Sequence, residues 1–182
     1  VAGDRVFKVV DTNEVNVNGG KNIADEIKGD ILFHDVSFSY DGVTPVLKNI
    51  NFELAAGKTL AIVGATGAGK TSIISLIGRM YEIEKGEIFI DGIEVKQYEL
   101  NALRRQIGLV LQDVFLFSGT VFENITLMEP GITTDEVEQA AKLCGAHDFI
   151  MQLPGKYHYK VMERGSTLSL GQRQLISFVR AM

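Results

Sequence analysis

The alternation of hydrophobic and polar positions predicts strands in the first third of the chain. Apolar side chains alternate with polar ones over 36–40, as far as the turn Asp41-Gly42, and again over 50–54. Such alternation is typical of strands that bury one face. The run 59–63 is apolar throughout and short, which predicts a fully buried strand. We therefore expect an antiparallel sheet laid beside an α/β core.

Helical spacing replaces this alternation from residue 70 onward. Isoleucines recur at helical spacing over 73–77, which predicts a helix from Lys70 to about Met80. The pattern predicts further elements elsewhere: strands over 87–91 and 107–111, and helices from a capping box at 133–136, over 148–153 and from Ser169 onward.

A glycine-rich stretch joins the predicted strand 59–63 to the helix that follows. It fits the P-loop pattern G-x-x-x-x-G-K-[ST] and reads Gly64-Ala65-Thr66-Gly67-Ala68-Gly69-Lys70-Thr71. Glycines let backbone N–H groups point into an anion-binding concavity, and the helix N-terminus adds partial positive charge. Lys70 would reach the outer phosphates, and the Thr71 hydroxyl would coordinate Mg²⁺. The sequence therefore predicts a nucleoside triphosphate site rather than a turn that carries a lysine by chance.

The composition of the 182 residues narrows the class of protein further. A net charge of −5 argues against a protein that binds nucleic acid through its phosphate backbone. No stretch approaches the roughly 20 apolar residues of a membrane span, and the single cysteine suits a reducing compartment. Because the first residue is Val, we expect the chain to be a piece of a longer protein.

From about Ile31 to Met182 the chain resembles the nucleotide-binding domain of an ATP-binding-cassette (ABC) transporter. Tyr40 stands where the family places the aromatic A-loop residue that stacks on adenine. Gln112 stands where it places the Q-loop glutamine, a contact of Mg²⁺ and water. The resemblance implies ATP and Mg²⁺ as ligands, with Thr71 and Gln112 at the metal. The nucleotide contacts that it implies are Tyr40, Val46, Gly64, Thr66, Gly67, Ala68, Gly69, Lys70, Thr71, Ser72 and Gln112.

A second motif lies at 168–172, which reads Leu-Ser-Leu-Gly-Gln. It resembles the family's signature LSGGQ with Leu170 in place of the first glycine, and the expected phosphate contacts Ser169 and Gly171 remain. Gln172 lies at capping-box spacing from Ser169, and a helix N-terminus of this kind can bind an anion. In the family this site closes over the ATP of a second nucleotide-binding domain, which implies a head-to-tail dimer. An ordinary capped surface helix is the alternative.

Two further stretches resemble exporters whose membrane helices precede the cassette on the same chain. They are 112–120, Gln-Asp-Val-Phe-Leu-Phe-Ser-Gly-Thr, and 163–165, Glu-Arg-Gly. The resemblance implies that 113–120 and 163–165 contact a transmembrane domain, and that the polar residues 1–30 form a linker from it. A solvated charge pair is the alternative for Glu163 and Arg164.

The resemblance also implies the domain plan and the location. Residues 31–112 would hold the nucleotide-binding core with an antiparallel β subdomain, and 113–182 a helical subdomain. The expected fold class is α/β, a P-loop NTPase core with these two subdomains, incomplete at the C-terminus. Such a domain would lie at the cytoplasmic face of a cell membrane, as part of a transporter.

The residues that catalyse hydrolysis in the family do not occur in this sequence. There, a Walker B strand of four apolar residues followed by Asp-Glu holds Mg²⁺ and activates water, and a later histidine completes the site. The stretch 88–91 mimics this pattern, but Gly92 follows where the glutamate should stand, so we interpret it as a hairpin. We expect no catalytic residue and no ATPase activity in this chain alone, whereas the intact exporter would hydrolyse ATP to drive transport.

Three other functions stay open at this point. The chain could be an ATP-binding module that never hydrolyses its ligand, such as the degenerate partner in a heterodimer. It could belong to a soluble ABC ATPase, although the stretch 163–165 argues against that class. A P-loop kinase is remote, because no acceptor site or lid pattern is visible.

Overall fold

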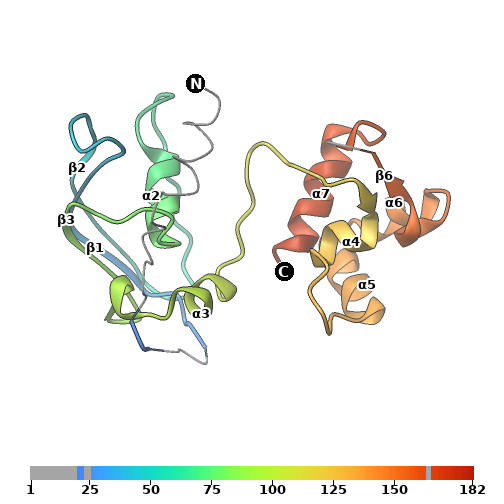
Figure 1. The fold of residues 1–182 in the computed structure, drawn as a ribbon, viewed down its shortest axis with the longest axis horizontal. Coiled ribbons are helices and arrows are strands. Elements are labelled where there is room, and N and C mark those ends of the chain that lie inside the picture. Colours follow the sequence, from blue (N-terminus) through green and yellow to red (C-terminus); the bar gives the residue numbers. More distant parts are fainter. Residues whose placement is uncertain (1–19, 23–25, 163–164) are drawn as a thin grey trace, which may run out of the picture. The chain divides into compact units, whose positions relative to one another are not determined.

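The computed structural model describes residues 20–22, 26–162 and 165–182, so that most of the expected linker 1–30 lies outside it. The described residues form two compact units, unit 1 up to Gln106 and unit 2 from Ile107 onward. Figure 1 shows unit 1 in blue to green and unit 2 in yellow to red. Among the described helices, none is both long and apolar enough to cross a membrane.

Unit 1 is built on a four-stranded antiparallel sheet in the order β2-β1-β3-β4. Its strands are β1 (Ile31–Ser39), β2 (Pro45–Leu54), β3 (Lys85–Ile90) and β4 (Ile93–Glu94). Within the sheet, β1 pairs its Phe33 with Phe52 of β2 and with Ile88 of β3. The sequence prediction of an antiparallel sheet from alternating side chains is thus confirmed, and the sheet buries Phe33, Val36, Phe38, Leu47, Ile88 and Ile90.

The hairpin between β3 and β4 turns at Asp91 and Gly92. Both residues have positive φ, 50° and 76°, as a two-residue type I′ turn requires. The Asp91 carboxylate accepts hydrogen bonds from the backbone N–H groups of Lys28, Gly29 and Asp30, at 2.6, 3.0 and 2.9 Å. The interpretation of 88–91 as a hairpin rather than a Walker B strand is therefore confirmed.

The described part of unit 1 also holds three helical segments: α2 (Lys70–Ile77), η1 (Val95–Gln97) and α3 (Leu100–Arg105). The predicted helix from Lys70 is confirmed, although it ends before Met80. Arg79 ends it by adopting a left-handed conformation, φ 46°. Arg104 of α3 then donates to the carbonyl oxygens of Gly78 and Arg79, at 3.0 and 2.6 Å. A basic side chain thereby satisfies carbonyls that the helix end leaves unpaired.

Two predicted strands are wrong. The segments 59–63 and 107–111 have no strand pairing, and the apolar Val63 and Leu111 are 88% and 56% exposed. A continuous apolar run becomes a buried strand only when neighbouring strands pair with it and helices cover its faces. Among the described residues, no strand of either unit pairs with these segments, so both stay outside any sheet and partly exposed.

Unit 2 is mainly helical and holds a small two-stranded sheet. Its described elements are β5 (Gly119–Thr120), α4 (Val121–Thr126), α5 (Thr134–Leu143), α6 (His147–Gln152), η2 (Lys156–His158), β6 (Lys160–Val161) and α7 (Leu170–Arg180). Capping boxes open α4, α5 and α7, with both reciprocal hydrogen bonds present in each. Those of α5 and α7 confirm the sequence prediction, because such boxes are specified by residues only three positions apart.

Candidate nucleotide-binding site

The glycine-rich loop passes directly into α2, and Gly69 is the residue that makes the junction possible. Gly69 is the N-cap of α2 in a left-handed conformation, φ 85°. A Cβ at this position would lie 2.6 Å from Leu47 Cδ2 and 3.3 Å from the Val46 carbonyl oxygen. Only glycine fits both the backbone angle and the space. The loop is therefore pressed against β2, beside Val46, the residue predicted to border the nucleotide.

The side chain of Lys70 turns back toward the loop and contacts its backbone. Its Nζ donates to the carbonyl oxygens of Gly64 and Ala65, at 2.9 and 2.8 Å. These contacts hold the ammonium group at the loop, where the outer phosphates of a nucleotide are expected. The remaining loop residues Thr66, Gly67 and Ala68 are exposed, so the concavity faces solvent.

The next two residues of α2 face different surroundings. Thr71 is exposed and lies at the second position of the helix, so its hydroxyl is accessible to a metal ion. Ser72 is buried, 4% exposed, and its Oγ lies 2.8 Å from the hydroxyl of Tyr40. Tyr40 follows the last residue of β1 and is 54% exposed. The fold therefore brings Tyr40, Val46 and the P-loop together in unit 1.

The other predicted site residues lie in unit 2. Gln112 is exposed and lies at a bend near the start of the unit. Ser169 is the N-cap of α7: its backbone N–H donates to Gln172 Oε1 at 2.9 Å, and its Oγ accepts from the Gln172 N–H at 3.2 Å. Leu170 is 58% exposed and Gly171 has open space around its Cα. Leu170, the expected replacement of a signature glycine, therefore disturbs no packing within unit 2.

The loop 113–120 is held by two residues that sequence reasoning missed. Asn124 of α4 is 1% exposed; its Oδ1 accepts from the Phe117 N–H at 2.8 Å, and its Nδ2 donates to the Phe117 carbonyl oxygen at 2.9 Å. Arg180 of α7 donates to the Phe115 carbonyl oxygen at 3.2 Å and to that of Asn124 at 2.8 Å. Burial lowers the pKa of the Arg180 guanidinium. An asparagine on the apolar face of α4 was the available sequence signal.

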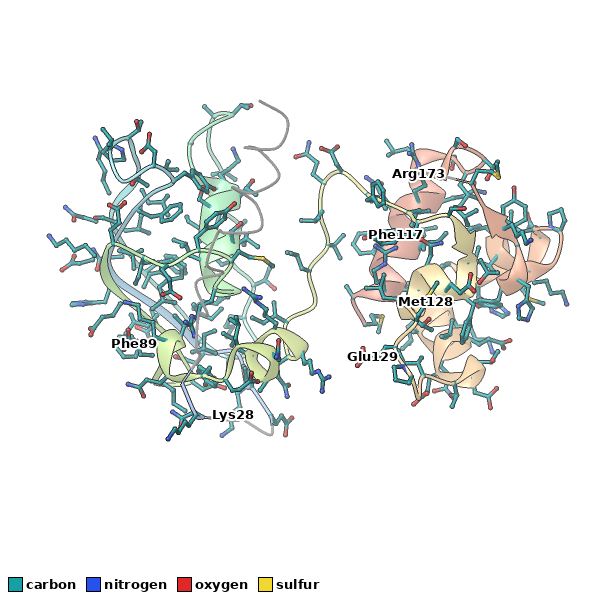
Figure 2. All side chains as sticks on the ribbon, viewed as in Figure 1. Lys28, Phe89, Phe117, Met128, Glu129 and Arg173 are labelled. Carbon is teal, nitrogen blue, oxygen red and sulfur yellow. The ribbon has the colours of Figure 1, made fainter. Side chains whose placement is uncertain are left out.

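A hollow of 510 Å³ lies beside this loop, lined by Phe117, Ser118, Glu123, Asn124, Leu127 and Met128. Figure 2 labels two of these residues, Phe117 and Met128. Phe117 and Phe115 stack edge to face, with ring centroids 5.0 Å apart, and each is about half exposed. Exposed apolar surface of this kind is typical of interaction sites. The predicted contacts Glu163 and Arg164 lie outside the described residues.

Comparison with known proteins shows what almost the whole chain is similar to. A family model described as "ABC transporter" matches residues 47–182. YknV of Bacillus subtilis, an ABC transporter ATP-binding protein by name, is 46% identical over 183 residues, covering 100% of this chain and 30% of YknV. YgaD of Bacillus subtilis, which carries a provisional name as a multidrug export ATP-binding/permease protein, is 42% identical over 179 residues, covering 97% of this chain and 31% of YgaD.

A solved structure is similar along almost the whole chain. It is that of a bacterial Atm1-family ABC exporter with ATP bound, with a TM-score of 0.85 and 35% sequence identity. The match covers 98% of this chain and 32% of the exporter chain. The chain thus spans about a third of the length of the proteins that it matches here.

Proposed function

The chain belongs to the ABC transporter family, and we propose that it is the ATP-binding, energy-coupling domain of an exporter. The observation that carries this proposal is the P-loop itself, in which Gly69 turns the chain into α2 and Lys70 lies over the loop. The similarity to YgaD and to an ATP-bound exporter supports the direction of transport. In the intact protein, ATP binding and hydrolysis would drive export across a membrane.

ATP would bind along unit 1 with its base at one end and its phosphates at the other. The exposed ring of Tyr40 would stack on adenine, and Val46 would border the nucleotide. Backbone N–H groups of 64–69 and the N-terminus of α2 would hold the phosphates, which Lys70 and Ser72 would contact from the side. The exposure of Thr66, Gly67 and Ala68 supports access of a polyphosphate chain to the loop.

Mg²⁺ would be held by the Thr71 hydroxyl and by Gln112, together with the phosphates. The metal would neutralise charge on the outer phosphate oxygens. Among the described residues there is no cluster of three or more His, Cys, Asp or Glu that could hold a metal alone. A donor set of one hydroxyl and one amide fits Mg²⁺, which keeps several waters and relies on substrate phosphates.

Two partners follow from the same proposal. A second nucleotide-binding domain would dock head to tail, with Ser169, Leu170, Gly171 and Gln172 over the ATP of the partner; the capped N-terminus of α7 supports this role. A transmembrane domain, upstream on the same chain, would contact 113–120 and 163–165. The apolar hollow beside Phe117, Leu127 and Met128 supports that contact, and it would place the domain at the cytoplasmic face of the membrane.

Titration of the chain with a fluorescent ATP analogue and Mg²⁺ tests the proposal. Lys70→Ala removes the ammonium group that would contact the phosphates, so its affinity should fall by about tenfold or more. Lys85→Ala, which removes an exposed lysine of β3, is the matched control and should bind as the wild type does. Equal affinity in the wild type and Lys70→Ala would overturn the assignment of the site.

A further inference from the structure

Three aromatic rings meet beside the P-loop, and only one of them has a role in the proposed site. Tyr40 meets Phe38 edge to face, with centroids 4.8 Å apart, and meets Tyr81 edge to face, with centroids 5.0 Å apart. Tyr81 also contacts Phe38 at 5.7 Å. Phe38 is buried, whereas Tyr40 and Tyr81 are each about half exposed. The ring of Tyr40 is therefore supported by two other rings and still has an open surface.

The same tyrosine is also held at its far end. Its hydroxyl lies 2.8 Å from Ser72 Oγ, and Ser72 is buried in the first turn of α2. Two interplanar angles near a right angle, 81° to Phe38 and 83° to Tyr81, fix the tilt of the ring. The hydrogen bond fixes its distance from the helix that carries the phosphate loop. An exposed side chain with only one of these restraints would sample several rotamers.

We propose that Tyr81 is a positioning residue for the base, which acts by holding the Tyr40 ring, tethered to Ser72, in the orientation that receives a purine. This inference rests on the proposed function, namely that the chain binds ATP. A ring that is already oriented loses less conformational entropy on binding, so more of the stacking energy appears as affinity. Tyr81 therefore contributes to recognition of the base and not to recognition of the phosphates.

The alternative is that Tyr81 only covers Phe38 and so stabilises the fold. The two roles differ in one measurable respect. Removal of a residue that only stabilises the fold should lower the melting temperature. It should leave the affinity of the folded protein unchanged for every ligand. A positioning residue changes the affinity for ATP and leaves unchanged the affinity for tripolyphosphate, which has no base.

The experiment is calorimetric titration of the purified full chain with ATP and, separately, with tripolyphosphate. Tyr81→Leu should weaken ATP binding about threefold to tenfold, the range that an aromatic pair supplies, and leave tripolyphosphate binding within about twofold. Tyr81→Phe keeps the ring and should bind ATP as the wild type does. Phe89→Leu, which removes a half-buried ring of β3 outside the cluster, is the control for loss of an aromatic.

A double-mutant cycle then separates this inference from the proposed function. In a Tyr40→Leu background, Tyr81→Leu should have no further effect on ATP affinity, because the ring that it positions is absent. Tyr81→Met, which removes the ring but keeps an unbranched apolar side chain beside Phe38, serves as the second variant if Tyr81→Leu fails to fold, and should weaken ATP binding over the same range without affecting tripolyphosphate. Unchanged ATP affinity in Tyr81→Leu, or equal losses for both ligands, would overturn the inference alone. Failure of the wild type to bind ATP would overturn the proposed function and the inference together.

Discussion

Gly69 is subject to two constraints at once, a left-handed backbone and crowding around its Cα, whereas Gly57 is subject only to the first. Its φ of 85° is strained for any residue with a side chain, and a Cβ would also meet Leu47 and Val46 at less than normal contact distance. Gly57 has a similar φ, 71°, but nothing lies within 4 Å of a Cβ added there. Substitutions at Gly57 and Gly69 therefore allow the effect of backbone strain to be measured apart from the effect of crowding.

Gly69→Ala should destabilise unit 1 by about 3 kcal/mol, since backbone strain and overpacking add. It should also displace the loop from β2 and weaken ATP binding. Gly57→Ala carries only the backbone strain and should cost about 1 kcal/mol, with no loss of affinity. Urea unfolding combined with ATP titration measures both quantities. An equal effect of the two variants on affinity would show that contact with Val46 and Leu47 is irrelevant to the site.

At the scale of elements, local sequence sets the start of most helices in unit 2. The boxes Thr133–Glu136 and Ser169–Gln172 were predictable because each partner lies three residues from the other. The strands 59–63 and 107–111 were mispredicted because pairing depends on a neighbour that the pattern of a single segment does not reveal. The contact of Tyr40 with Ser72 joins residues 32 positions apart, so no local pattern could indicate it.

The capping box of α5 should make stability depend on pH. The backbone N–H and the hydroxyl of Thr133 donate to the Glu136 carboxylate and hold the pKa of Glu136 below its usual value. A carboxylate whose pKa is lower in the folded state than in the unfolded state adds to the free energy of unfolding. This contribution is fully present at pH values above the pKa of the unfolded state, and it is lost as the pH falls through the pKa of the folded state.

Glu136→Gln should therefore flatten the decline in stability below about pH 4.5, because glutamine can still accept the N-cap hydrogen bond but does not titrate. The midpoint of urea unfolding, followed between pH 7 and 3, measures this. Glu129→Gln removes an exposed carboxylate of the same unit outside any capping box and should leave the decline as in the wild type. Parallel curves for Glu136→Gln and the wild type would contradict the assignment.

At the scale of the whole molecule, the residues of the proposed site are divided between the two units. Tyr40, Val46 and the P-loop belong to unit 1, whereas Gln112 and Ser169 belong to unit 2. The sequence motifs predicted each group, because each motif is a local stretch with a recognisable pattern. Asn124 and Arg180, which support the loop 113–120, could not be found in this way because their contacts are tertiary.

We expect the 182-residue chain to bind ATP but to hydrolyse it far more slowly than a transporter does. No glutamate follows four apolar residues and an aspartate in its sequence, and the candidate Asp91 is bonded to backbone N–H groups of 28–30. Without a general base the attacking water is not activated. Phosphate release from Mg-ATP measures this, and rapid release that Lys70→Ala abolishes would contradict it.

The exposed apolar segments 59–63 and 107–111 should make the isolated chain associate with itself. Leu60, Val63, Leu109 and Leu111 are each more than a third exposed, and the backbone around them has no strand partner. Exposed apolar runs with unpaired N–H and C=O groups favour intermolecular pairing. Sedimentation at increasing concentration should show oligomers, and Val63→Lys with Leu111→Lys should reduce them. A wild-type chain that stays monomeric over that range would disprove the prediction.

The contacts of Lys70 bear on how a ligand enters the loop. Its ammonium group has three N–H donors and already donates to the Gly64 and Ala65 carbonyl oxygens, so a phosphate that bonds to more than the third N–H must replace a carbonyl oxygen. The net gain is the difference between phosphate oxygens and the carbonyl oxygens that they replace. A small monovalent anion would gain little in that exchange, whereas a polyphosphate could replace both oxygens and also bond to the N–H groups of the loop. We therefore expect the loop to bind a polyphosphate in preference to a small monovalent anion.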